Sequence, residues 1–193
     1  MNSPATVEFW LDRIRAAVAE DRHDPVRAAL GYAGAAETLR NVKNSIRILD
    51  RYVRHGDRVL EIGCGCGDLY PLMPEGVDYW GIDLVPDFIE EARKAYVEPR
   101  SLHMRDSCRF DVIDIVKDHW DFRDNLNSHN WDVVVGKMVE ATIGGSVGKD
   151  TWHEVMTTLV CVGRKVILWS SHHTVPSVFV AAGGKPIQTQ EAK

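Results

Sequence analysis

The feature of this sequence that most constrains its fold is a short apolar run followed at once by three glycines. Residues 59–62 contain three aliphatic side chains, enough for one buried strand, and Gly63, Gly65 and Gly67 follow at alternate positions. Glycine lets the chain turn with a positive φ angle, and without a Cβ it lets a ligand approach the backbone closely. Open α/β folds bind nucleotides with such a loop at the carboxyl end of a strand. We therefore predict a nucleotide-binding α/β domain, with a ligand-free glycine turn as the alternative.

The spacing of the glycines and one acidic residue narrow this prediction. The loop reads Gly-x-Gly-x-Gly rather than the Gly-x-Gly-x-x-Gly of dinucleotide-binding loops, and Glu61 stands two positions before Gly63. In this form, E-I-G-C-G-C-G, the stretch resembles the first motif of S-adenosylmethionine-dependent methyltransferases. The resemblance covers roughly residues 40–170 and implies S-adenosyl-L-methionine as the cofactor. It places Glu61, Gly63, Cys64 and Gly65 at the cofactor site.

A second acidic signature lies where the next predicted strand ends, in Gly81-Ile82-Asp83-Leu84. This stretch resembles the second motif of the same family, and it implies that Asp83 and Leu84 bind the cofactor. A carboxylate at a strand end can accept hydrogen bonds from two vicinal ribose hydroxyls. Dinucleotide enzymes bind ribose with an acid in the same position. Asp83 therefore indicates a ligand that contains adenosine, but it does not show that the ligand is a methyl donor. The alternative is that Asp83 only caps the following helix.

The resemblance also implies a third acid, at the end of the next strand, that accepts a hydrogen bond from the adenine amino group. Two residues fit this role. Asp114 follows the more strand-like stretch, whereas Asp106 precedes the small residue that the family favours at that place. Both stay open, with a slight preference for Asp114.

The family places residues of the substrate side after the fourth strand, which here is the stretch 137–140. The Asp/Asn-Pro-Pro-aromatic motif of DNA amino-methyltransferases is absent from it, which argues against methylation of a base amino group. Lys137 is assigned to the cofactor side of this edge. Methyl transfer from a sulfonium needs alignment, exclusion of water and sometimes a base, and the catalytic candidates are Glu140, His172 and its neighbour His173. A structural role is the alternative for the two histidines.

Apolar periodicity predicts the secondary structure of most of the chain. Strands that alternate with helices favour a parallel sheet with right-handed crossovers. We therefore expect an α/β, Rossmann-like, doubly wound and mostly parallel sheet with a helical N-terminal extension and a shortened C-terminal part. Pro71 and Pro74 leave room for only a short helix after the glycine loop. A third N-terminal helix should bury Leu39, Val42, Ile46, Leu49 and Val53. The expected strands are 58–62, 78–83, 109–114, 131–136 and 165–169, and the expected helices are 4–20, one from Asp24-Pro25, one up to Gly56, 86–97 and 150–162.

The chain is expected to form one domain over residues 1–193, with 1–38 as a helical extension or lid, 39–171 as the cofactor-binding core and 172–193 as a hairpin or tail. Residues 178–180 and 187–189 flank Gly183-Gly184, which suits a tight turn. Pro186 lacks a donor N–H and would therefore lie at a sheet edge. If this tail is loose, a second copy of the chain could cover the exposed flank.

Composition limits the classes of partner. A net charge of −5 argues against sequence-blind binding of nucleic acid, which needs a basic surface. The four cysteines contain no C-x-x-C pair, so neither a zinc site nor a disulfide framework is expected. No apolar run approaches the ~20 residues of a membrane span, and the N-terminus does not read as a signal peptide. These features predict a cytoplasmic protein without a metal site. The resemblance to the methyltransferase family implies an enzyme that methylates a small molecule or a protein. The alternatives are a weakly binding or inactive methyltransferase-like scaffold and, less favoured, an NAD-dependent oxidoreductase.

Overall fold

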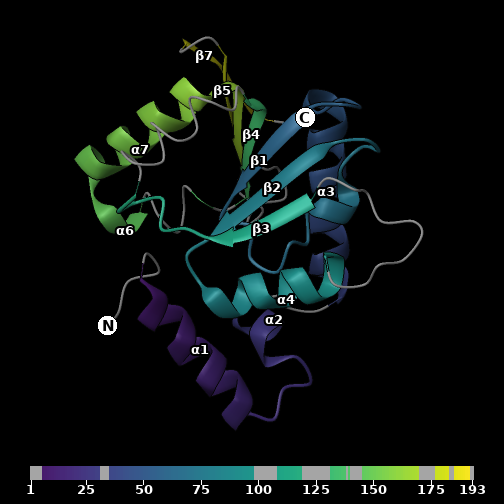
Figure 1. The fold of residues 1–193 in the computed structure, drawn as a ribbon, viewed down its shortest axis with the longest axis vertical. Coiled ribbons are helices and arrows are strands. Elements are labelled where there is room, and N and C mark those ends of the chain that lie inside the picture. The colour runs from purple at the N-terminus through teal and green to yellow at the C-terminus, as the bar shows by residue number, and fades with distance from the viewer. Residues whose placement is uncertain are drawn as a thin grey trace.

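The fold is seen in a computed structural model, which describes residues 6–30, 35–97, 108–118, 131–137, 139, 145–169, 177–182 and 185–191. Its centre is a seven-stranded sheet in the order β3-β2-β1-β4-β5-β6-β7 (Figure 1). The pairings from β3 across to β5 are parallel, and those of β6 and β7 are antiparallel. The expected α/β, Rossmann-like fold is thus confirmed. The strands are β1 Arg58–Ile62, β2 Asp78–Asp83, β3 Cys108–Val112, β4 Trp131–Lys137, β5 Gly163–Trp169, β6 Ser177–Ala182 and β7 Lys185–Glu191.

The strand order reverses at β1, which lies between β2 and β4. Glu61 of β1 is in register with Gly81 of β2 on one side and with Val135 of β4 on the other. In an open α/β sheet, ligands bind outside the carboxyl ends of the strands at such a switch point. The glycine loop leaves β1 there, so the topology positions it for a ligand.

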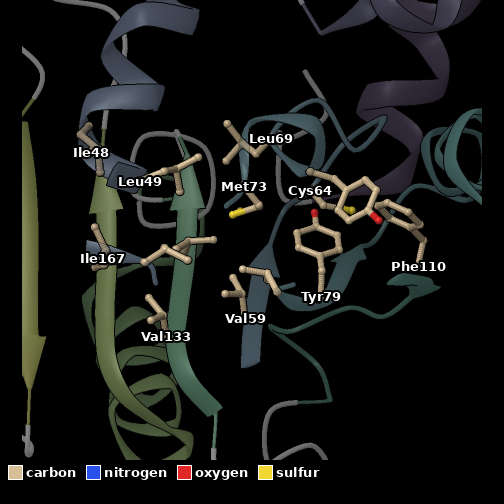
Figure 2. Packing of buried hydrophobic residues seen from close by; sticks show 14 of the residues in the cluster. Ile48, Leu49, Val59, Cys64, Leu69, Met73, Tyr79, Phe110, Val133 and Ile167 are labelled. Atoms are coloured by element: carbon tan, nitrogen blue, oxygen red, sulfur yellow. The ribbon is translucent and has the colours of Figure 1, made fainter. Parts of the chain in front are cut away.

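Apolar side chains cover both faces of the sheet. One face packs against α3 (Ala35–Tyr52), α4 (Pro86–Tyr96) and the 3-10 helix η1 (Tyr70–Leu72). Figure 2 shows part of this cluster, with Ile48 and Leu49 of α3 above Ile167 of β5. The other face packs against α7 (Lys149–Val162), and α6 (Gly145–Val147) lies just before it in the chain. The sheet is therefore the middle layer of three, as expected for a doubly wound fold.

Two short helices, α1 (Val7–Ala19) and α2 (Pro25–Ala29), precede this core. The side chain of Asp24 caps α2 by accepting from the Arg27 backbone N–H at 3.0 Å, and Pro25 stands at the first turn, as the sequence predicts. Figure 1 shows α1 and α2 together at one end of the molecule, beside α4. Their apolar side chains form a third cluster with the start of α4 and with Cys66 of the glycine loop.

The structure corrects two details of the sequence interpretation. Ile46 of α3 is 37% exposed, while Ser45 beside it is buried, because the face that meets the sheet is rotated from the expected one. The third strand ends at Val112 rather than at residue 114. The helix after the glycine loop is short, as predicted: it is the three-residue 3-10 helix η1.

The chain after β5 returns as a hairpin. Leu168 of β5 is in register with Phe179 of β6, and β7 then pairs with β6 along the edge of the sheet. Pro186 lies in β7, where a missing N–H is tolerated because, among the described strands, β7 pairs with β6 alone.

Candidate functional site

A small open pocket lies at the carboxyl ends of β1, β2 and β3. Such pockets at the switch point of a parallel sheet are common ligand sites. Four residues that the sequence singled out or considered line this pocket: Gly63, Asp83, Leu84 and Asp114. The rest of its wall is aliphatic and comes from Ile62, Ile82, Ile113, Ile115 and Val116.

Asp83 connects the pocket to the glycine loop. Its Oδ2 accepts a hydrogen bond from the Gly65 backbone N–H at 2.9 Å, and its Oδ1 accepts one from Val85 N–H at 3.0 Å. Burial raises the pKa of this carboxyl to about 6, and the backbone hydrogen bonds oppose that rise. Each carboxylate oxygen has a second lone pair. Asp83 therefore holds the backbone of the glycine loop and of Val85, and it keeps unused acceptor capacity in the wall of the pocket.

The glycine loop adopts the left-handed backbone that its sequence predicts. Gly63, Gly65 and Gly67 have φ angles of +63°, +54° and +76°. A Cβ on Gly67 would stand 2.9 Å from the ring of Phe110, so glycine is required there for space as well as for conformation. The loop is consequently fixed against the core of the sheet.

A buried polar pair lies beneath this loop. Glu61 and Tyr79 are 2% and 1% exposed, and the Tyr79 hydroxyl donates a hydrogen bond to Glu61 Oε2. Burial raises the pKa of Glu61 to about 8, while the bond from Tyr79 and the charge of Lys137 lower it. Burial also lowers the pKa of Lys137, at the end of β4. Sequence reasoning selected Glu61 and Lys137 but missed Tyr79.

Asp114 lines the side of the pocket that follows β3, whereas Gly63 lines the side that follows β1. Its Oδ1 accepts hydrogen bonds from Val116 N–H at 3.1 Å and Lys117 N–H at 3.3 Å, and its Oδ2 pairs with Lys117 Nζ at 3.0 Å. These bonds fix the carboxylate in the turn after β3. The other residue considered for this role, Asp106, lies outside the described residues.

The second helix rests on the glycine loop, which the sequence did not reveal. Arg27 of α2 forms an ion pair with Asp68, directly after Gly67. Leu30, which ends α2, has a methyl group 3.3 Å from where a Cβ of Gly65 would stand. The N-terminal helices are therefore part of the wall that supports the loop.

The remaining predicted residues divide into two groups. Cys64 is buried in the loop, where burial raises the pKa of its thiol. Glu140, His172 and His173 lie outside the described residues.

Comparison with known proteins gives short sequence matches and a broader match in fold. No family model matches the chain. Over 68 residues, or 33% of this chain, it is 43% identical to the mRNA cap guanine-N(7) methyltransferase of Saccharomyces cerevisiae and 40% identical to that of Candida glabrata. The match covers only 16% of each of these two relatives.

Solved structures match a larger part of the chain. The methyltransferase domain of bacterial CtHen1-C aligns with a TM-score of 0.54 at 16% identity, over 69% of this chain and 65% of that chain. The magnesium protoporphyrin IX methyltransferase (ChlM) from Synechocystis PCC 6803, with bound SAM, aligns with a TM-score of 0.51 at 20% identity, over 69% and 59%. The described core of this chain therefore has the Rossmann-like fold of class I S-adenosylmethionine-dependent methyltransferases.

Proposed function

We propose that this protein transfers a methyl group from S-adenosyl-L-methionine to a small-molecule or protein acceptor. The observation that carries this proposal is the position of Asp83, which joins a left-handed glycine loop to a pocket at the switch point of the sheet. The short sequence match to two methyltransferases supports the same activity.

The chemistry of the pocket fits an adenosine. Asp83 offers acceptor capacity for vicinal ribose hydroxyls. The aliphatic side chains of Leu84, Ile113 and Ile115 offer apolar surface to a purine ring, and the Asp114 carboxylate can accept from its amino group. The methionine part of the cofactor would then extend over Gly63 toward the region above Glu61. The bound cofactor would supply the electrophilic methyl group, and this chain would hold it in line with the acceptor.

We further propose that the N-terminal helices are a lid over the cofactor pocket within a single domain. The side chain of Leu84 belongs both to the pocket wall and to the apolar cluster that includes Trp10 and Leu11 of α1. The pKa of Lys117 is raised by its hydrogen bond to Asp114 and, more weakly, by the charge of Glu8. Helix α1 thus places apolar side chains against the start of α4, beside one wall of the pocket.

The charge of the chain favours a small-molecule or protein acceptor. A net charge of −5 does not favour extended contact with nucleic acid.

If the acceptor must lose a proton, Glu140 and His172 remain the proposed bases. Among the described residues, no helix combines the length and the apolar character that crossing a bilayer requires. The edge strand β7 could pair with a second copy of the chain, which light scattering would detect as a doubled molar mass.

The second candidate function is a methyltransferase-like scaffold with weak cofactor binding. It is favoured by the three-residue 3-10 turn after the glycine loop, which provides no helix N-terminus over the pocket. An NAD-dependent oxidoreductase is disfavoured by the spacing of the glycines.

A methyl-transfer assay separates an enzyme from a scaffold. The protein is incubated with S-adenosylmethionine labelled in its methyl group and with a panel of small-molecule, peptide and cap-analogue acceptors. An enzyme produces S-adenosylhomocysteine and a labelled acceptor in equal amounts. Saturable binding of S-adenosylhomocysteine without turnover of any acceptor would favour the scaffold, and no binding would refute both readings.

A further inference from the structure

Tyr79 is the part of this site that neither the motifs nor the proposed function assign. It lies on β2 two residues before Gly81, the register partner of Glu61 on β1. Side chains two positions apart on a strand point to the same face, so the Tyr79 ring stands diagonally beside Glu61. Its hydroxyl donates to Glu61 Oε2, and both side chains are buried.

The ring of Tyr79 is held firmly by other aromatic rings. Its centroid lies 5.0 Å from that of Tyr70 and 5.5 Å from that of Phe110. Figure 2 shows the ring rising from β2 with its hydroxyl directed toward the glycine loop, on the side of Cys64. The place of the hydroxyl is therefore set by the core of the sheet and does not depend on a ligand.

A buried carboxylate is unfavourable unless hydrogen bonds or opposite charges compensate it. Around Glu61, Lys137 from β4 favours the ionised form, as does the bond from Tyr79 on β2. Asp68 and Asp83 disfavour it, and burial disfavours it most. The proton occupancy of Glu61 thus depends on a balance in which Tyr79 is the hydrogen-bond donor.

We propose that Tyr79 is a positioning residue of the cofactor site, which holds Glu61 beneath the glycine loop so that its negative charge acts on the ammonium group of a bound methionine moiety. This inference rests on the proposed function. The inference adds to the proposed function by naming the residue whose hydrogen bond helps determine the pH at which Glu61 ionises.

The pH dependence of cofactor affinity follows from this arrangement. In the free protein the pKa of Glu61 is about 8, so the carboxyl is mostly protonated at neutral pH. A ligand ammonium favours the ionised form. Affinity should therefore rise by about tenfold per pH unit below that value and level off near it.

Tyr79→Phe keeps the ring and its packing but removes the donor. Losing a hydrogen bond to a charged group changes an equilibrium constant by about ten- to a hundredfold. The pH at which affinity levels off should rise by about one to two units, and affinity at pH 7 should fall by about ten- to a hundredfold.

The experiment titrates S-adenosylhomocysteine into the full chain by calorimetry between pH 6 and 8.5. We expect the affinity of the wild type to rise with pH and to level off near pH 8. The affinity of Tyr79→Phe should keep rising through pH 8.5. Glu61→Gln should show no such rise. Tyr70→Phe, which removes a hydroxyl from the neighbouring ring of the same cluster, should follow the wild-type profile.

A second measurement needs no variant of Tyr79. Repeating the titration at pH 7 in two buffers of different ionisation enthalpy should show the release of nearly one proton by the wild type and none by Glu61→Gln. The inference would be overturned if the Tyr79→Phe protein bound S-adenosylhomocysteine as tightly as the wild type, or more weakly by the same factor at every pH. It would also be overturned if the affinity of Glu61→Gln still rose with pH and levelled off as in the wild type. Those results would leave the proposed function intact, whereas a wild type that binds no S-adenosylhomocysteine at any pH would refute both.

Discussion

Replacing Asp83 with alanine should damage both the fold and the cofactor site. The sequence alone predicts a loss of cofactor affinity with an intact fold, because Asp83 is assigned there to a ribose. In the structure, Asp83 also accepts from the backbone N–H groups of Gly65 and Val85, at 2.9 and 3.0 Å. Alanine would leave both donors buried without this acceptor.

The size of the effect follows from these two bonds. A buried donor without a partner costs about 1–3 kcal/mol, so Asp83→Ala, which leaves two such donors, should lose roughly 2–6 kcal/mol of unfolding free energy. Asp83→Asn keeps one carbonyl oxygen and should lose about half as much. Both variants should bind S-adenosylhomocysteine at least about tenfold more weakly, because a charged hydrogen-bond acceptor is worth about 1.5–3 kcal/mol.

Urea unfolding and titration calorimetry measure the two effects separately. Asp150→Ala, which removes an exposed carboxylate from the first turn of α7, is the matched control and should change neither quantity appreciably. An Asp83→Ala protein as stable as the wild type would refute the role of the two backbone bonds. Unchanged affinity in a folded variant would refute the ribose assignment.

Three further predictions follow from the same site. Gly65→Val should abolish cofactor binding, because a β-branched residue disfavours a φ of +54° and its side chain would meet Leu30; a folded variant that binds normally would contradict this. Arg27→Ala should lower the free energy of unfolding by up to about 1 kcal/mol and speed proteolysis within residues 6–30. The control Arg22→Ala removes an ion pair in which both side chains are 62% exposed, and it should have neither effect. Equal behaviour of the two variants would argue against the attachment of α2 to the loop. The pKa of Glu61 rises on folding from 4.5 to about 8, so the folded state binds the extra proton and stability falls with rising pH across that window. Glu61→Gln should escape this loss, so its free energy of unfolding should increase relative to that of the wild type by up to about 1.4 kcal/mol per pH unit as pH rises. If the free energies of unfolding of the two proteins changed with pH in parallel, the raised pKa would be refuted.

The strands and the placement of the acids could be predicted from sequence for one physical reason. Each strand is a short apolar run, and parallel strands bring their carboxyl ends to one edge. An acid that follows such a run, such as Asp83 or Asp114, must then lie at that edge. Both do line the pocket.

The contacts that hold the site together follow no local pattern. Arg27 and Asp68 are 41 residues apart in the sequence, so their ion pair depends on how α2 packs. The burial of Ser45 in place of Ile46 likewise depends on the rotation of α3 against the sheet. Tyr79 could have been found, since it is a polar aromatic residue inside a buried strand next to one that carries Glu61, and each such group needs a partner.

The central claim, that the pocket is built for S-adenosylmethionine, is tested most directly by thermal unfolding with three ligands. A ligand at about a hundred times its dissociation constant adds roughly 2.7 kcal/mol to the unfolding free energy. We expect S-adenosylmethionine and S-adenosylhomocysteine each to raise the melting temperature and NAD to leave it unchanged. A rise with NAD, and none with either sulfur nucleoside, would contradict the account.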